Sequence, residues 1–294
     1  MKSQEQDPEK DPQRTGEEAS PVERLMTRFA LEPLDRDLFL GDPGPGRQRL
    51  FGGLVAAQSY MAAALTLDDP RERPLHSLHA YFLRPGRYAL PIRFVVDRIR
   101  DGKSFTTRRV VAHQGGEAIF NLAASFARSE EGVSRQDDAP ASADPETLPP
   151  HRGGAWRSAE RAPLDPIEMR SPDGLLEEGE PVATPRIVWM RPRGPLPDDP
   201  CIHTALLVYA SDRSLVSTAI RNVDEPRERF RLASLDHALW LHRPVRFDDW
   251  LQFASESPVA HAARGLIFGS VYQKDGARIA SVAQEGLVRM RRDD

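Results

Sequence analysis

The chain has 294 residues, 39% of them hydrophobic, and a formal net charge of −4, as expected for a globular protein with room for two domains. The mildly acidic balance argues against a nucleic-acid partner, which usually needs a concentrated basic surface. The single cysteine, Cys201, excludes a disulfide framework within the chain, and no His/Asp/Glu spacing suggests zinc, so we expect no metal and no cofactor. No apolar run approaches the roughly 20 residues that span a bilayer, so we expect no stable membrane insertion.

Residues 1–21 are polar and charged and lack periodic apolar positions, which predicts a disordered tail. This segment also lacks the hydrophobic run of a signal peptide, and the C-terminal "MRRDD" carries no peroxisomal or retention signal. We therefore expect a cytoplasmic protein.

A first ordered block is expected over residues 22–128. Its helix candidate, "FGGLVAAQSYMAAALTL" at 51–67, is Ala-rich and apolar nearly all round, which predicts a buried helix. Strand-like runs follow, and Gly115-Gly116 lies where a tight hairpin turn needs positive φ. A buried helix followed by antiparallel strands indicates an α+β layer architecture, with a curved sheet wrapped around the helix.

Residues 129–182 separate this block from a second one. They include "QDDAPASADPETLPPHRGG" and "SPDGLLEEGEPVATP", which are rich in Pro, Asp, Glu and Gly. Such a composition predicts a long linker with at most short elements.

The second block, residues 183–294, repeats the order of the first. A helix candidate at 201–212 follows "LPDDP", "HALWLHRP" matches "HAYFLRP" of the first block, and Asp275-Gly276 provides the hairpin turn. The first histidines of the two matched strings, His79 and His237, are 158 residues apart, and the hairpins are about 160 apart. A nearly fixed offset over several segments indicates an internal duplication.

The stretch "RLASLDHALWLHRPVRF", residues 231–247, is apolar enough for a buried strand, yet it contains Ser234, Asp236, His237, His242 and Arg243. Successive side chains of a strand point to opposite faces, so Ser234, Asp236 and His242 are expected on one face and His237 on the other. A match to the strand of the first block suggests an architectural role for His237 and Arg243.

The two blocks together resemble the acyl-CoA thioesterase II family of double hotdog proteins. The matching strings are "FGG", "LHSLHAYFLRPG", "RDGKSFTTRRVVAHQ", "YASD", "LDHALWLHRP" and "ASVAQEGLVR", and their order and spacing make the match specific. The resemblance implies a tandem hotdog fold, in which each repeat is a long central helix wrapped by an antiparallel sheet. It also implies hydrolysis of acyl-CoA thioesters to a free fatty acid and coenzyme A.

Three positions match the residues that the family is thought to arrange around one water molecule: Asp212, Ser234 and Gln284. Ser234 stands where many members have Thr, and either hydroxyl offers one donor and two acceptors. With offsets of 158 and 160, Ser234 corresponds to His76 and Gln284 to Ala124. The first block therefore lacks the polar pair, so we expect one water-activating site per chain, with the first block completing the pocket.

The resemblance and the need to bind an anionic coenzyme suggest these substrate-binding residues: Phe51, Gly52, Gly53, His79, Arg84, Arg109 and Arg243. The glycines at the start of the first helix suit either close approach of a ligand or tight helix packing. Two of the arginines precede matched prolines, which also suggests a structural role in both halves.

Two other functions remain open for a chain of this kind. One is a hotdog enoyl-CoA hydratase or dehydratase, although adjacent Asp236 and His237 should point to opposite faces of a strand. The other is a non-catalytic acyl-CoA binding protein, which would not need the polar trio. On fold analogy we also expect a homo-oligomer.

Overall fold

The computed structural model describes residues 19–46, 49–151, 165–175, 184–221 and 223–291, so nearly all of the expected tail lies outside the described residues. The helices are α1 (Pro21–Phe29), α2 (Gly52–Ala64), α3 (Pro200–Ser211) and α4 (Leu215–Thr218), with 3-10 helices at Pro145–Thr147, Pro172–Leu175 and Arg227–Arg229. The strands are β1 (Glu32–Asp35), β2 (Leu38–Gly41), β3 (Leu75–Phe82), β4 (Ile92–Asp101), β5 (Phe105–Gln114), β6 (Glu117–Ala127), β7 (Ile167–Arg170), β8 (Arg186–Pro192), β9 (Phe230–Ser234), β10 (Asp236–Leu241), β11 (Leu251–His261), β12 (Arg264–Gln273) and β13 (Arg278–Met290).

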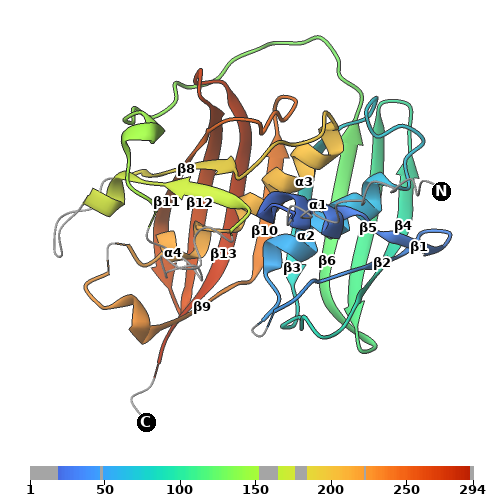
Figure 1. Ribbon diagram of the computed structural model, residues 1–294, viewed down its shortest axis with the longest axis horizontal. Coiled ribbons are helices and arrows are strands. Elements are labelled where there is room, and N and C mark those ends of the chain that lie inside the picture. The colour runs from blue at the N-terminus through green and yellow to red at the C-terminus, as the bar shows by residue number, and fades with distance from the viewer. Residues whose placement is uncertain (1–18, 47–48, 152–164, 176–183, 222, 292–294) are drawn as a thin grey trace, which may run out of the picture.

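The strands of the described residues form one 13-stranded sheet, in the order β1-β2-β4-β5-β6-β3-β10-β13-β12-β11-β8-β7, with β9 also pairing with β13. An N-terminal half, up to β6, and a C-terminal half, from β7 onward, join where β3 pairs antiparallel with β10, and Leu78 there lies opposite Leu239. Helices α2 and α3 lie side by side on one face of this sheet (Figure 1). The α+β prediction, with one helix and one antiparallel sheet per half, is confirmed.

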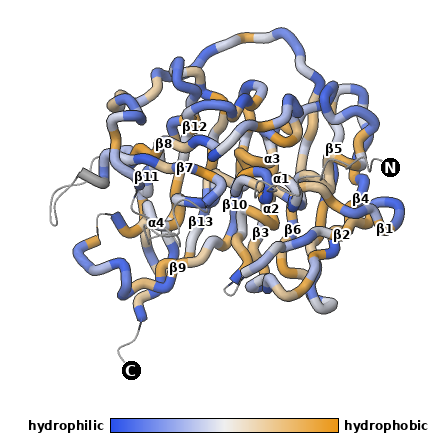
Figure 2. The backbone as a smooth tube through the Cα atoms, in the orientation of Figure 1, coloured by the Kyte–Doolittle hydropathy of each residue, from blue (hydrophilic) through white to orange (hydrophobic). Residues whose placement is uncertain are grey.

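The two central helices form the core because their side chains are small or apolar almost all round. Figure 2 shows hydrophobic residues concentrated in these helices and in the strands around them. At the start of α2 a Cβ atom on Gly53 would lie 2.4 Å from the backbone oxygen of Tyr209 in α3. Gly53 therefore permits close packing of the two helices, which is one of the two roles that the sequence left open.

The hairpin turns have the predicted backbone. Gly115, Gly116 and Gly276 have φ values of +58°, +87° and +85°, a region that glycine enters without steric cost. No helix among the described residues is both long and apolar enough to cross a bilayer.

A β-bulge recurs in both halves and corrects the expected alignment. The register of β3 shifts between Leu75 and Ser77, and the strand of the second half is interrupted at Leu235, between β9 and β10. Leu75 before the first bulge lies opposite Phe126, and Ser234 before the second lies opposite Gly286. Ser234 therefore corresponds to Leu75, not to His76, because the strand offset is 159 rather than 158.

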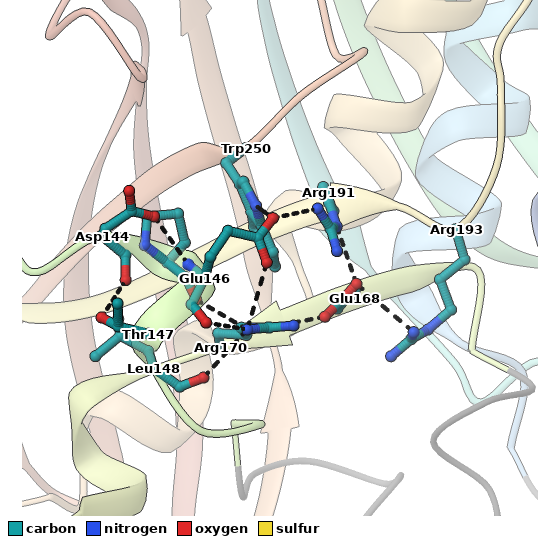
Figure 3. Close-up of polar contacts among 10 residues, drawn as sticks. Asp144, Glu146, Thr147, Leu148, Glu168, Arg170, Arg191, Arg193 and Trp250 are labelled. Carbon is teal, nitrogen blue, oxygen red and sulfur yellow. Dashed lines mark hydrogen bonds and ion pairs between the residues drawn. The ribbon is translucent and has the colours of Figure 1, made fainter.

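The region predicted to be a linker includes short elements that pack against the C-terminal half. Strand β7 pairs with β8, and Glu168 of β7 accepts hydrogen bonds from Arg170 at 2.8 Å and from Arg191 of β8 at 2.9 Å. Arg191 also donates to Glu146 at 2.6 Å, and so does the Trp250 indole at 3.0 Å (Figure 3). These contacts attach the segment around Glu146 to the sheet.

Candidate active site

A pocket of about 850 Å³ lies between the two halves, where α2 begins and α3 ends. The end of β3 and strand β9 complete its wall. Asp212 is the only carboxylate among the described residues that line it, whereas four arginines do so: Arg49, Arg84, Arg213 and Arg227. The remaining wall is largely apolar.

Asp212 caps the C-terminus of α3 and is the hub of the polar contacts in this pocket. Its Oδ1 atom accepts hydrogen bonds from Ser234 Oγ at 3.0 Å and from Gln284 Nε2 at 2.8 Å. Asp212 is half-buried on the pocket wall, and burial raises its pKa to about 6, against the lowering effects of Gln284, Ser234, the backbone N–H of Gly53 and the charge of Arg213. The carboxyl group therefore gains and loses its proton closer to neutral pH than an ordinary aspartate does.

Helix α2 approaches the carboxylate with its N-terminus, and Gly52 leaves no room there for a side chain. A Cβ atom on Gly52 would lie 2.9 Å from Asp212 Oδ2 and 2.5 Å from the ring of Phe82. The next residue, Gly53, donates its backbone N–H to Asp212. The glycine pair therefore serves both the packing of α2 on α3 and the approach of α2 to Asp212.

Ser234 reaches Asp212 from the end of β9, and the bulge at Leu235 changes the face of the residues that follow. The prediction that Ser234 and His237 lie on opposite faces is wrong, because the extra residue shifts the alternation by one. His237 is buried and contacts Gln284, the other hydrogen-bond donor to Asp212. Ser234 and His237 therefore lie on the same side of the strand, and both contact the group formed by Asp212 and Gln284.

Gln284 of β13 lies behind Asp212, away from the pocket wall. Its side chain is completely buried. Its Nε2 atom donates to Asp212 and lies 3.3 Å from His237 Nδ1, while its Oε1 atom has no hydrogen-bond partner among the described residues. Gln284 thus contacts Asp212 directly, whereas Asp212 and Ser234 line the pocket.

The structure brings together some of the expected substrate-binding residues and leaves others apart. Phe51, Gly52 and Arg84 line the pocket. His79 packs its ring against Trp240 on the opposite face of the sheet, because Leu78 and Ala80 occupy the buried positions of β3.

Two of the expected arginines lie outside the pocket. Arg109 is exposed on β5 and pairs with Asp97, and Arg243 lines a separate hollow beside Arg278. Arg84 and Arg243 donate to the backbone oxygens of Ala118 and Arg278, respectively. These oxygens occupy matched positions in the two halves, so each arginine ties the start of a hairpin strand, as the matched prolines suggested.

The sequence interpretation missed two residues at the site. Arg213 follows Asp212 in the chain, pairs with Asp165, donates to the Tyr209 hydroxyl at 3.2 Å and lies 5.7 Å from the ring of Phe51. Its place next to the Asp of "YASD" was the available signal. His237 was interpreted as architectural because its string has a counterpart in the first block, and the alternation rule also placed it on the wrong face.

Comparison with solved structures places this architecture in the hotdog fold. A protein from Alicyclobacillus acidocaldarius described as having a hot dog fold superposes with a TM-score of 0.71 over 92% of this chain at 18% identity. Acyl-CoA thioesterase II TesB2 from Mycobacterium marinum has a TM-score of 0.78 and 39% identity, covering 92% of this chain and 99% of that one. The predicted tandem hotdog is confirmed.

Sequence comparison then gives the family. Residues 41–127 match the model of the acyl-CoA thioesterase N-terminal domain, and residues 165–287 match that of acyl-CoA thioesterase. Acyl-coenzyme A thioesterase 8 of Mus musculus is 35% identical over 89% of this chain and 87% of its own length, and acyl-CoA thioesterase 2 of Haemophilus influenzae is 31% identical over 91% and 98%. The chain belongs to the acyl-CoA thioesterase family, and it is a thioester hydrolase.

Proposed function

We propose that this protein hydrolyses acyl-CoA thioesters to a fatty acid and coenzyme A, with a water molecule activated by Asp212 beside Ser234. The observation that carries the proposal is the Asp212 carboxylate itself. It lies on the wall of a pocket large enough for a thioester substrate, and three donors hold it in place: Ser234, Gln284 and the N–H of Gly53. A general base works best when its pKa lies near the working pH, which matches the raised pKa of about 6 at Asp212.

The reaction follows from these positions. Asp212 takes a proton from the water as the water oxygen bonds to the thioester carbonyl carbon, and Ser234 offers lone pairs that orient the water. The tetrahedral intermediate then collapses with cleavage of the C–S bond, and protonated Asp212 returns the proton to the leaving thiolate. Gln284 acts through Asp212, because it is buried behind the carboxylate.

The oxyanion needs donors that the carboxylate does not use. We assign this role to the backbone N–H of Gly52, the first residue of α2, because the N–H of Gly53 donates to Asp212 and that of Leu54 to the Phe51 carbonyl oxygen. The positive end of the helix dipole, at the N-terminus of α2, also favours a negative charge there.

The pocket also separates the two ends of the substrate by chemistry. Arg49, Arg84 and Arg227 suit the phosphates of coenzyme A, which prefer guanidinium groups, whereas Arg213 is buried and pairs with Asp165. An acyl chain suits the apolar part of the wall, whose members come from both halves of the chain: Leu50, Val55, Phe82, Ile119, Phe120, Val216 and Leu232. The N-terminal half thus completes the pocket, while the proposed catalytic base, Asp212, comes from the C-terminal half.

The test is thiol release from palmitoyl-CoA and from shorter acyl-CoAs by the wild-type protein and by Asp212→Asn. The variant is expected to lose about 10³-fold in kcat/KM, in the range of general acid–base catalysis. Its Tm at pH 7 is expected to be at least that of the wild type, because burial disfavours the ionised carboxylate. Asp275→Asn, in a hairpin turn, serves as the control and keeps full activity.

Full activity of Asp212→Asn would refute the role of Asp212 as the general base. Binding of acyl-CoA without release of thiol would support the binding-protein alternative, and hydration of an enoyl-CoA would support the hydratase alternative.

We also propose that the protein is a homo-oligomer. The proposal rests on analogy with other proteins of this fold, whose sheets pack against one another. Light scattering of the purified chain measures the assembly, and a mass equal to one chain would contradict it.

A further inference from the structure

His237 is a buried histidine in a core position that the other half fills with an apolar residue. In β3 the position that corresponds to His237 is Leu78, which lies opposite Ala124, the counterpart of Gln284. His237 is 1% exposed and Leu78 is 0% exposed, so both sites belong to the core. An imidazole at such a position needs hydrogen-bond partners that a leucine does not.

The partners of His237 form one chain of hydrogen bonds that ends at Asp212. His237 Nε2 lies 2.9 Å from Ser211 Oγ, and Ser211 Oγ donates to the backbone oxygen of Val208 at 3.0 Å. Ser211 uses its proton in that bond, so His237 carries its hydrogen on Nε2 and donates it to Ser211. Nδ1 is then an acceptor, and it faces Gln284 Nε2 at 3.3 Å.

This tautomer decides how the Gln284 amide is oriented. When the NH₂ group of Gln284 lies between Asp212 and His237, it donates one hydrogen to Asp212 and directs the other at His237. The reversed amide would place an oxygen against two acceptors, Asp212 Oδ1 and His237 Nδ1. This orientation leaves Oε1 buried and without a partner among the described residues, and the two donated hydrogen bonds offset the loss.

From these contacts we infer that His237 is a positioning residue for hydrolysis: its Nδ1 atom holds the Gln284 amide so that the NH₂ group orients the Asp212 carboxylate. The inference rests on the proposed function, because it concerns the same carboxylate. Burial lowers the pKa of His237 to about 4, so the imidazole remains a neutral acceptor over the working pH range. Ser211 sets the tautomer from the last turn of α3, directly before Asp212.

The experiment compares His237→Leu with His237→Asn in thiol release from palmitoyl-CoA. Leucine fits the matched position of the other half, whereas the amide oxygen of asparagine can replace the Nδ1 acceptor. His237→Leu is expected to lower kcat about 10²-fold with little change in KM, the scale of a misplaced catalytic group. His237→Asn is expected to recover most of that loss, and Leu78→Val, a core change in the other half, is expected to leave kcat unchanged.

Two further readouts separate positioning from a general weakening of the core. In a Gln284→Ala background, His237→Leu should add no further loss, because His237 acts through Gln284. The acid limb of kcat/KM should move to higher pH in His237→Leu, since the Gln284 hydrogen bond lowers the pKa of Asp212. The other groups that act on Asp212, namely Ser234, the Gly53 N–H and Arg213, are unchanged in these variants.

Additive losses in the double variant, or an unshifted acid limb with normal kcat in His237→Leu, would overturn the inference. If His237→Leu does not fold, His237→Gln provides the same contrast, because its amide reaches Ser211 and places no acceptor at Nδ1. The proposed function fails separately: Asp212→Asn with full activity refutes the base, whereas an inactive Asp212→Asn with a fully active His237→Leu refutes only the positioning role.

Discussion

Asp212 combines two environments that act on its pKa in opposite directions. Burial disfavours the charged carboxylate, while the hydrogen bonds from Gln284, Ser234 and Gly53 and the charge of Arg213 favour it. Burial has the larger effect, so the group loses its proton at about pH 6 rather than near pH 4. A base of this kind is weak enough to be ionised at neutral pH and strong enough to accept a proton from water.

The pH dependence of the activity follows from this balance. Because the base must be ionised, kcat/KM is expected to rise with pH and to reach half of its plateau near pH 6. Ser234→Ala removes a hydrogen bond that lowers the pKa, so its half-point should move upward. Initial rates between pH 4.5 and 8 measure both, with circular dichroism as the control for folding. A half-point near 4, the ordinary value of an aspartate, would contradict the raised pKa of Asp212.

At the scale of elements, the site depends on how closely the N-terminus of α2 approaches the C-terminus of α3. Gly52 and Gly53 carry no Cβ at the two points of nearest contact. Asp212 and Ser234 are far apart in the chain. Asp212 ends α3 and Ser234 precedes the bulge at Leu235, and the fold brings the two side chains within hydrogen-bond distance. Gly52 and Gly53 thus determine how closely α2 can approach Asp212.

Gly52→Ala tests the approach of α2 to the carboxylate. The added methyl group would lie 2.9 Å from Asp212 Oδ2 and 2.5 Å from the Phe82 ring, so either the helix or the carboxylate must move. We expect a loss of at least about 10²-fold in kcat/KM, because a displacement of about 1 Å is enough for such an effect. Gly132→Ala is the matched control, since a Cβ there meets nothing within 4 Å. Wild-type kinetics in Gly52→Ala would contradict the contact.

At the scale of the whole molecule, the two halves have the same architecture but different chemistry. The bulge and the strand register recur, yet the positions of Ser234 and Gln284 are taken by Leu75 and Ala124 in the N-terminal half. Both of these are buried and apolar. The N-terminal half therefore lacks the groups that hold a base, although it contributes much of the pocket wall.

A binding stoichiometry of one acyl-CoA per chain follows from this asymmetry. Isothermal titration with a thioether analogue of acyl-CoA, which cannot be hydrolysed, is expected to give one site per chain. The same titration with Asp212→Asn should keep one site, because the pocket wall is unchanged. Two equal sites per chain would show that the matched region of the other half also binds substrate.

Much of the fold and part of the site could be predicted from local patterns. The boundaries of α2 and α3 were predicted to within a few residues, since a long run that is apolar all round is typical of a buried helix. Turn glycines were placed correctly because a tight hairpin turn needs positive φ. The resemblance pointed to Asp212, Ser234 and Gln284, and the structure brings these three residues into contact.

The sequence by itself determined the duplicated order of helix and strands and the turns, because these depend on patterns of neighbouring residues, while the three polar residues were proposed from the family resemblance. Only the tertiary structure decided which of them share a face, how deeply Gln284 is buried and which arginines reach the pocket. A bulge adds one residue to a strand, and it becomes visible only through pairing with another strand. For that reason alternation placed His237 opposite Ser234, whereas in the folded chain both contact the cluster around Asp212.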